Sequence, residues 1–183
     1  MILKKISKKH IITAIILITI FFIYFLISNQ QVYGNDQASI EQVIKSIEGY
    51  ENDSIEILEI NDINDDRFVG FLSNHNPAYI QFTKNHNGDY QWNYIEKSSG
   101  QSFSEFLINV RNDHSNELKM MIVTTQENEI AKMQLSVNNQ VKEQEFSVNQ
   151  KCVHWINIPR SKDNNYTFEY KFFDNNGNLL SVN

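Results

Sequence analysis

One apolar segment, residues 11–27, constrains this 183-residue chain more than any other feature. No charged residue interrupts it, and it reads Ile-Ile-Thr-Ala-Ile-Ile-Leu-Ile-Thr-Ile-Phe-Phe-Ile-Tyr-Phe-Leu-Ile. A helix needs about 20 mainly apolar residues, with about 17 as the lower limit, to cross the hydrocarbon core of a bilayer. A buried helix of a globular domain has one apolar face, whereas this segment is apolar all round. The sequence therefore predicts a transmembrane helix over residues 11–28, with the lipid bilayer as its partner.

The basic residues around this segment predict its direction. The first basic residue after it is Lys45, and four lysines precede it: Lys4, Lys5, Lys8 and Lys9. Positively charged flanks stay on the cytoplasmic side of a membrane. We therefore expect residues 1–10 to be a cytoplasmic basic tail. Residues 29–35 would be a polar linker, and the C-terminal domain would lie outside the cell, held by a single-pass anchor.

A cleaved signal peptide is the alternative interpretation of the same segment. Signal peptides have an apolar core of about 7–15 residues that ends at small residues, and this core is longer. Val32 and Gly34 fit the small positions before a cleavage site, so release after Gly34 stays open. The only cysteine is Cys152, far from the segment, which excludes a lipoprotein anchor.

The composition after the anchor limits the classes of partner. Four of the 16 basic residues precede the anchor and all 22 acidic residues follow it, so the remainder has a net charge of −10. Nucleic-acid binding depends on basic contacts to phosphate, and we expect no nucleic-acid partner. A single cysteine allows no intrachain disulfide. Among exported proteins this suits a Gram-positive cell surface better than a eukaryotic secretory pathway, where disulfides are common.

Periodicity predicts one helix and then strands. Asn35 or Asp36 can cap a helix that runs to about Ile47, with apolar residues spaced along one face, and Gly49 ends it. The strands expected before residue 98 cover residues 54–61, 67–73, 78–84 and 89–97. Asn85-His86-Asn87-Gly88 between two of them is a hairpin signal. We expect residues 36–100 to form a small unit of one helix and strands.

Seven further strands are expected after the polar break at residues 98–102. Met133, Leu135 and Val137 alternate with polar residues, which is typical of a half-buried strand. The ranges are 103–110, 118–125, 129–137, 141–148, 152–158, 166–173 and 178–182. Short strands separated by turn signals favour a β-sandwich-like unit over residues 101–183. The predicted fold class is therefore α+β, mostly antiparallel β, behind an N-terminal transmembrane helix.

The order of these features resembles a known group of proteins. The chain has a lysine-rich anchor, one amphipathic helix and a hairpin that carries Asn87-Gly88-Asp89-Tyr90-Gln91-Trp92. Trp155 and the run Phe173-Asp174-Asn175-Asn176-Gly177-Asn178 follow. This pattern is similar to uncharacterised, small, single-pass surface proteins of bacilli and related Firmicutes. The resemblance implies an architecture and a location, and it implies no catalytic residue.

Cys152 and His154 are the first candidates for chemistry. Residues two apart on a strand share a face, and a thiol beside an imidazole can act as a nucleophile. At a rise of about 3.3 Å per residue, such neighbours lie about 6–7 Å apart. We therefore expect no direct hydrogen bond between them.

Two metal-site patterns are incomplete. Asp62-Ile63-Asn64-Asp65-Asp66 resembles the start of a Ca²⁺ loop, but Arg67 stands where a glycine is needed and Ser73 where a glutamate is needed. Loop histidines His75, His86 and His114 have no zinc-site spacing. No phosphate loop or hydrolase motif is present either. We assign no catalytic, cofactor-binding or metal residue, and no cofactor.

Aromatic residues on the predicted strands form the last candidate site. They could gather into a patch that binds a glycan or a peptide, although aromatic residues on strands are more often buried. The set is Tyr79, Tyr90, Trp92, Tyr94, Trp155, Tyr166 and Tyr170.

These observations predict a membrane-anchored extracytoplasmic module of the bacterial cell envelope that binds or assists another envelope component. An envelope protein is the expected partner. The alternatives are a secreted effector or immunity protein released after Gly34, and an envelope enzyme that uses Cys152 and His154 or clustered carboxylates.

Overall fold

The computed structural model describes residues 12–13, 15–22, 32–112, 115–161, 163 and 165–182. The chain divides into two compact units, Met1–Val32 and Tyr33–Asn183. Each is described by itself below.

In the first unit, described residues 12–13 and 15–22 are helical. Thr19 donates its hydroxyl hydrogen to the carbonyl oxygen of Ile15 at 2.9 Å, one turn back. The large apolar side chains are each more than half exposed: Ile12, Ile15, Ile16, Leu17, Ile18, Ile20, Phe21 and Phe22. Within the described residues, no helix combines the length and the apolar character needed to span a bilayer. Residues 11, 14 and 23–28 of the predicted span, and the predicted tail 1–10, lie outside the described residues.

The second unit is α+β and mostly antiparallel β, which confirms that part of the predicted class. Helix α2 spans Gln37–Lys45. Sheet A has the order β1 (Ile55–Ile63), β2 (Asp66–Ser73), β3 (Asn76–Lys84) and β4 (Tyr90–Lys97). Sheet B has the order β5 (Phe103–Asn112), β6 (Ser115–Thr124) and β9 (Cys152–Asn157). Sheet C has the order β11 (Leu179–Val182), β10 (Phe168–Phe173), β7 (Lys132–Val137) and β8 (Gln140–Glu145).

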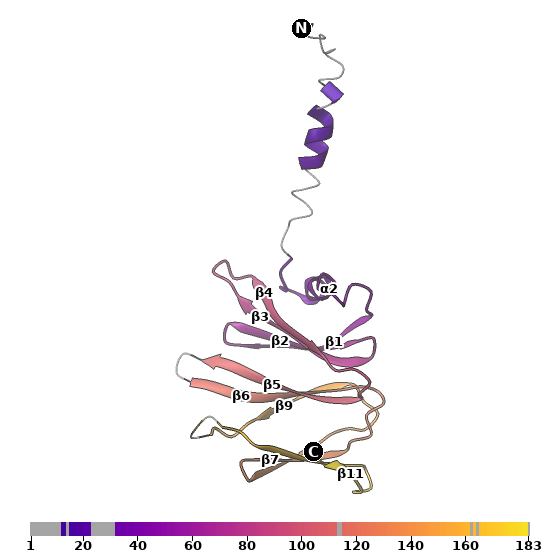
Figure 1. Ribbon diagram of the computed structural model, residues 1–183, viewed down its shortest axis with the longest axis vertical. Helices are drawn as coiled ribbons and strands as arrows, with labels where there is room; N and C mark the ends of the chain where they lie inside the picture. The colour runs from indigo at the N-terminus through magenta and orange to yellow at the C-terminus, as the bar shows by residue number, and fades with distance from the viewer. Residues whose placement is uncertain are drawn as a thin grey trace, which may run out of the picture. The chain divides into compact units, whose positions relative to one another are not determined.

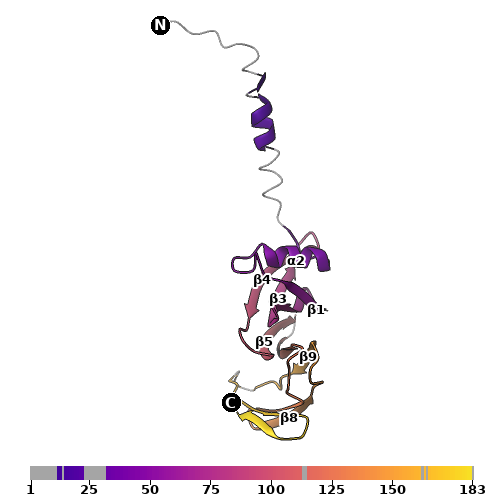
Figure 2. The same cartoon turned by 90° about the vertical axis from the view of Figure 1, so that its right-hand side faces the viewer.

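The helix and the three sheets form successive layers, with sheet B between sheets A and C (Figures 1 and 2). The first core lies between α2 and sheet A and includes Ile40, Ile44, Phe71 and Phe82. The second core joins sheets A and B through Phe68, Leu72, Phe106, Ile108 and Met121. The third core joins sheets B and C through Phe103, Met120, Ile122, Leu135 and Phe172. The face-to-face packing of sheets B and C is consistent with the predicted sandwich-like arrangement.

Strand β6 explains why sheet B can be buried on both faces. Met120 and Ile122 point toward sheet C, and Met121 and Val123 point toward sheet A. A strand that is covered on both sides has a continuous apolar run instead of alternation, as β6 has here. Its neighbours are β5 and β9, while the hairpin between β6 and β9 in sequence belongs to sheet C.

Sheet A is displaced sideways relative to sheet B. Inter-sheet contacts join β1 to β9, β2 to β6, and β3 to both β6 and β5. Strand β4, the next strand of sheet A, therefore extends beyond β5, which is the edge of sheet B. We call this part of sheet A the overhang of β4.

The N-terminus of α2 is closed by a capping box. Asp36 accepts a hydrogen bond from the backbone N–H of Ser39 at 2.8 Å, and Ser39 accepts one from the backbone N–H of Asp36 at 2.9 Å. These bonds satisfy two donors that a helix start leaves free. The helix ends at Lys45, two residues before the predicted end. Ile40, Val43 and Ile44 are buried, so the predicted apolar face of the helix is confirmed.

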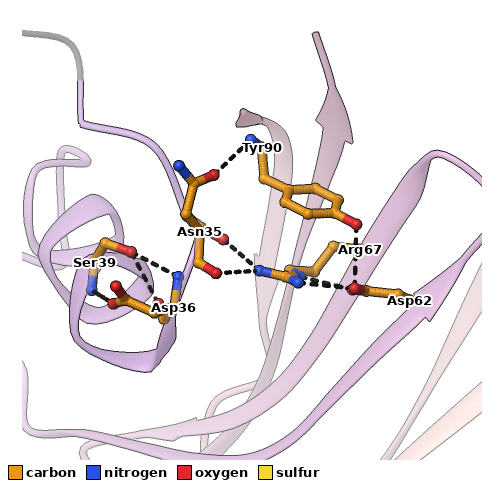
Figure 3. A network of polar contacts seen from close by, with 7 residues as sticks. Asn35, Asp36, Ser39, Asp62, Arg67 and Tyr90 are labelled. Atoms are coloured by element: carbon orange, nitrogen blue, oxygen red, sulfur yellow. Dashed lines mark hydrogen bonds and ion pairs between the residues drawn. The ribbon is translucent and has the colours of Figure 1, made fainter. Parts of the chain in front are cut away.

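Arg67 fixes the chain just before this helix (Figure 3). Its guanidinium donates to the carbonyl oxygens of Gly34 at 2.8 Å and Asn35 at 2.9 Å. The same group forms a two-bond ion pair with Asp62 and lies over the ring of Tyr90, 3.9 Å from its centroid. We call this arrangement the clasp. Residues 34 and 35, at the end of the predicted linker, are thus bonded into the second unit.

Candidate functional site: a groove beneath the overhang of β4

A hollow of about 690 Å³ lies beneath the overhang of β4. Strands β3, β4 and β5 supply its lining: Tyr79, Gln81, Thr83, Asn93, Tyr94, Glu96, Leu107 and Asn109. We call it the groove. Its position follows from the offset of the two sheets, because β4 extends past β5, the edge strand of sheet B among the described strands.

Two tyrosines define the aromatic part of the groove. Tyr79 is buried and its ring lies 5.0 Å from that of Phe106, on the sheet B side. The ring of Tyr94 lies 5.6 Å from that of Tyr79, and Tyr94 is 48% exposed. An aromatic ring that is fixed on one side and open on the other offers contact area with little loss of side-chain entropy on binding.

The polar groups of the groove are held by one another. Tyr94 donates its hydroxyl hydrogen to Glu96 at 3.0 Å, and this bond raises the pKa of Tyr94. Burial raises the pKa of Tyr79 well above its ordinary value. At the other end, the amide of Asn93 donates to the hydroxyl of Thr83 at 2.7 Å, and Thr83 donates to Asp66. Both tyrosines are therefore neutral at physiological pH, and the groove offers amide, hydroxyl and carboxylate groups.

A β-bulge in β4 places Tyr94 in the groove. Gln81 pairs with Tyr94 and Phe82 pairs with Trp92, so Asn93 is an extra residue between two consecutive pairs. Paired residues share a face of the sheet. Trp92 therefore lies with buried Phe82 on the α2 side, and Tyr94 lies on the side of sheet B. Without the bulge, Trp92 and Tyr94 would share one face.

The edge of β5 forms the floor of the groove. The side chains of Phe106 and Ile108 are buried against sheet A. Leu107 and Asn109 alternate with them, so these two residues reach the groove along the strand edge. Leu107 is 45% exposed. The groove thus combines the face of one sheet with the open edge of another.

The predicted aromatic patch does not form as one surface. Of its seven members, only Tyr79 and Tyr94 line the groove. Tyr90 and Trp92 lie on the α2 side of sheet A, and Trp155 packs on Phe68 in the second core. The remaining two, Tyr166 and Tyr170, pack against the third core. The bulge at Asn93 places Trp92 and Tyr94 on opposite faces of sheet A, and alternation alone could not locate it.

Cys152 and His154 do contact each other, and the prediction of no direct hydrogen bond was wrong. Sγ of Cys152 lies 3.1 Å from Nε2 of His154. The expected separation of about 6–7 Å took account only of the rise along the strand. In the structure the two side chains lean toward each other. Thr124 lies 3.0 Å from the same sulfur, and Phe146 packs edge-on against the imidazole. Burial lowers the pKa of His154, which favours the neutral imidazole. A nucleophilic cysteine–histidine pair needs a thiolate, and a charged imidazolium stabilises the thiolate. The neutral imidazole of His154 is therefore less suited to this role.

The Ca²⁺-like segment folds into a tight turn between β1 and β2. Both carboxylate oxygens of Asp62 accept hydrogen bonds from Arg67, and this contact lowers the pKa of Asp62. Asp66 accepts a hydrogen bond from Thr83. Within the part of the chain that the structure describes, no group of three or more histidine, cysteine or acidic side chains could hold a metal ion.

The loop histidines do not converge. His75 precedes β3 and His86 follows it. At about 3.3 Å per residue, a nine-residue strand keeps them on the order of 30 Å apart. His114 lies outside the described residues.

Comparison with protein-family models, with curated proteins and with solved structures gave no match to this chain. The assignment of a functional site therefore depends on the geometry described above.

Proposed function

We propose that this chain is a single-pass, membrane-anchored module of the bacterial cell envelope whose extracytoplasmic domain binds another envelope component in the groove. The groove carries the proposal. It is a hollow of about 690 Å³ in which an exposed aromatic ring, a carboxylate and several amide and hydroxyl groups converge. Binding sites combine apolar contact area with a few polar groups that fix orientation.

The first unit supports the anchor. Its described helical residues expose their apolar side chains on all sides, as a helix in contact with lipid tails does. The hydroxyl of Thr19 is satisfied within the helix, so it needs no water. Four lysines on one side of the segment and an acidic domain on the other support a cytoplasmic N-terminus and an external C-terminal domain.

Fractionation of cells that express the chain with a C-terminal tag tests the anchor. We expect an uncleaved product in the membrane fraction, identified by its intact mass and degraded by protease added outside the cells. A product in the medium that starts near Asn35 would overturn the anchor.

In-cell photo-crosslinking tests the groove. We would place p-benzoylphenylalanine at position 94, in the groove, and at position 141 as a matched control. Val141 is 58% exposed on β8, away from the groove. We expect a discrete crosslinked product at position 94 that is absent at position 141. Equal labelling at both positions, or none at position 94, would contradict a binding role for the groove.

The clasp bears on the alternative of a secreted product released after Gly34. Gly34 is buried, donates its N–H to Tyr90 at 2.8 Å and accepts from Arg67. A mature chain that starts at Asn35 would lose both bonds and place a new α-ammonium group near the Arg67 guanidinium. These contacts favour the uncleaved form, and a chain that starts at Asn35 should unfold at a lower temperature than one that starts at Val32.

A further inference from the structure

A further strand could be added to sheet B, and the groove is the space that this strand would occupy. Within the described residues, sheets A and C each have four strands, whereas sheet B, between them, has three. Sheet A covers sheet B from β9 to β5, and β4 continues beyond it. On the other face, the rings of Phe103 on β5 and Phe172 on β10 lie 5.4 Å apart. Because β11 is the next strand after β10, sheet C also continues past the edge of β5.

The hydrogen-bonding pattern identifies which groups of β5 face this space. Neighbouring residues of an antiparallel strand direct their N–H and C=O alternately to one side and the other. Thr125 donates its N–H to the carbonyl oxygen of Ser102, so Ser102 is bonded toward β6. By alternation Ser104, Phe106 and Ile108 are also bonded toward β6. The backbone groups of Glu105, Leu107 and Asn109 therefore point away from β6, toward the groove.

We propose that the ligand of the groove is an extended peptide segment of a partner protein, which pairs with the open edge of β5 as a fourth strand of sheet B. This inference rests on the proposed binding role of the groove and names its ligand class. Pairing would satisfy the outward N–H and C=O groups of Leu107 and Asn109. This mode of binding is β-strand addition, in which main-chain hydrogen bonds supply affinity and alternate side chains supply specificity.

The overhang of β4 excludes a second copy of this chain as the added strand. Antiparallel pairing of two β5 edges places both copies of sheet A on the same side of the joined sheet. The partner's β5 would then lie under this chain's β4, together with its own β3 and β4. The two overhangs would occupy the same space. A single strand with no layer of its own above it fits beneath β4.

The charge of the groove selects a basic peptide. Among the described side chains that line it, Glu96 is the charged one, and the whole region after the anchor has a net charge of −10. The exposed ring of Tyr94 lies beside Glu96, to which its hydroxyl is bonded. A lysine or arginine side chain on the upper face of the added strand can lie over this ring and pair with the carboxylate.

The test uses the full chain in detergent micelles and a displayed library of random nine-residue peptides. We expect the selected peptides to be enriched in lysine or arginine at alternate positions. Leu107→Pro removes one outward N–H without removing a bond to β6, and proline is tolerated on such an edge. It should weaken binding of the selected peptides by about tenfold or more, and by at least about threefold more than Leu107→Ala, which keeps the N–H.

Val141→Pro is the matched control. Phe146 donates its N–H to Ala131, so alternation directs the N–H of Val141 outward from β8, on an edge remote from the groove. This variant should bind the peptides as the wild type does. If Leu107→Pro fails to fold, peptides N-methylated at alternate residues test the same hydrogen bonds on the wild-type protein. Peptides with one of the two N-methylation patterns should bind the wild-type protein about tenfold more weakly than the unmethylated peptide.

Two results would overturn the proposal. One is a selection that yields no peptide sensitive to position 107 or to N-methylation. The other is binding of N-acetylglucosamine tetramer that is lost in Tyr94→Ala and unaffected by Leu107→Pro. That second result would keep the groove as a binding site and leave the proposed function standing. If neither a peptide nor the N-acetylglucosamine tetramer binds, and position 94 gives no crosslinked product, the proposed function is overturned as well.

Discussion

The interface between sheets A and B has two ends that differ in what lies across from sheet A. At the end near β1, sheet A meets β9. The rings of Phe68 and Trp155 pack edge-on with centroids 5.9 Å apart, and Trp155 donates its indole N–H to Glu59 at 2.7 Å. At the end near β4, Tyr79 packs on Phe106, but Tyr94 faces the groove. The first end is closed and the second is open.

The comparison shows that the extent of sheet B opposite sheet A, and not residue type, decides which aromatic residues are available to a ligand. Both ends carry aromatic side chains on the same face of sheet A. Those opposite a strand of sheet B are buried, and Tyr94, beyond the last strand, is exposed. If this account is correct, stability should depend on the closed end and binding on the open end.

The largest effect is expected from Phe68→Ala. Phe68 is completely buried at the closed end, and truncation of a buried phenylalanine costs about 3–5 kcal/mol. Tyr94→Ala at the open end should change the free energy of unfolding by less than about 1 kcal/mol, because the side chain is half exposed. Urea unfolding followed by tryptophan fluorescence measures both. Equal losses would show that the open end also holds the two sheets together.

Gly70→Ala should have the next largest effect. A Cβ at position 70 would lie 2.6 Å from Cγ2 of Val153, so the backbone of β2 approaches β9 too closely for a side chain. Overpacking of this kind costs about 1–3 kcal/mol. Val153→Ala removes the obstructing methyl groups. The double variant should therefore lose less stability than the two single losses combined, and strict additivity would contradict the close approach.

Glu105→Gln probes the edge strand beside the groove and should have a smaller effect. Burial raises the pKa of Glu105 in the folded protein above its value in the unfolded chain. The ionised carboxylate therefore destabilises the fold at neutral pH, and this cost disappears as the pH falls through the folded-state pKa. We expect the variant to unfold at higher urea than the wild type at pH 7. The two should converge in acid, and a constant difference across pH would contradict the role of burial.

Local patterns predicted most elements of the fold because they depend on near neighbours in the sequence. The strand with Met133, Leu135 and Val137 alternates as expected, and all three side chains are buried. The capped helix and its buried face were also predictable, since the spacing of Ile40, Val43 and Ile44 allows only one buried side.

The groove could not be predicted because it depends on long-range arrangement. The pairing of β6 with β9 across an intervening hairpin decides that sheet B has three strands. The bulge at Asn93 reverses the alternation in β4, and no glycine marks it. The contact between Cys152 and His154 was missed for a related reason, since it depends on side-chain lean and not on spacing along the strand.

The smallest effect is expected from the ion pair that joins the two sheets at the surface of the closed end. Lys151, just before β9, lies 2.7 Å from Glu56 on β1, and both side chains are about a third to a half exposed. Such pairs contribute about 0–1 kcal/mol, because water and salt screen them. Lys151→Met should therefore lower stability slightly in low salt and not at all in 1 M NaCl. A loss as large as that of Gly70→Ala, persisting in high salt, would mean that charge rather than close packing holds the closed end together.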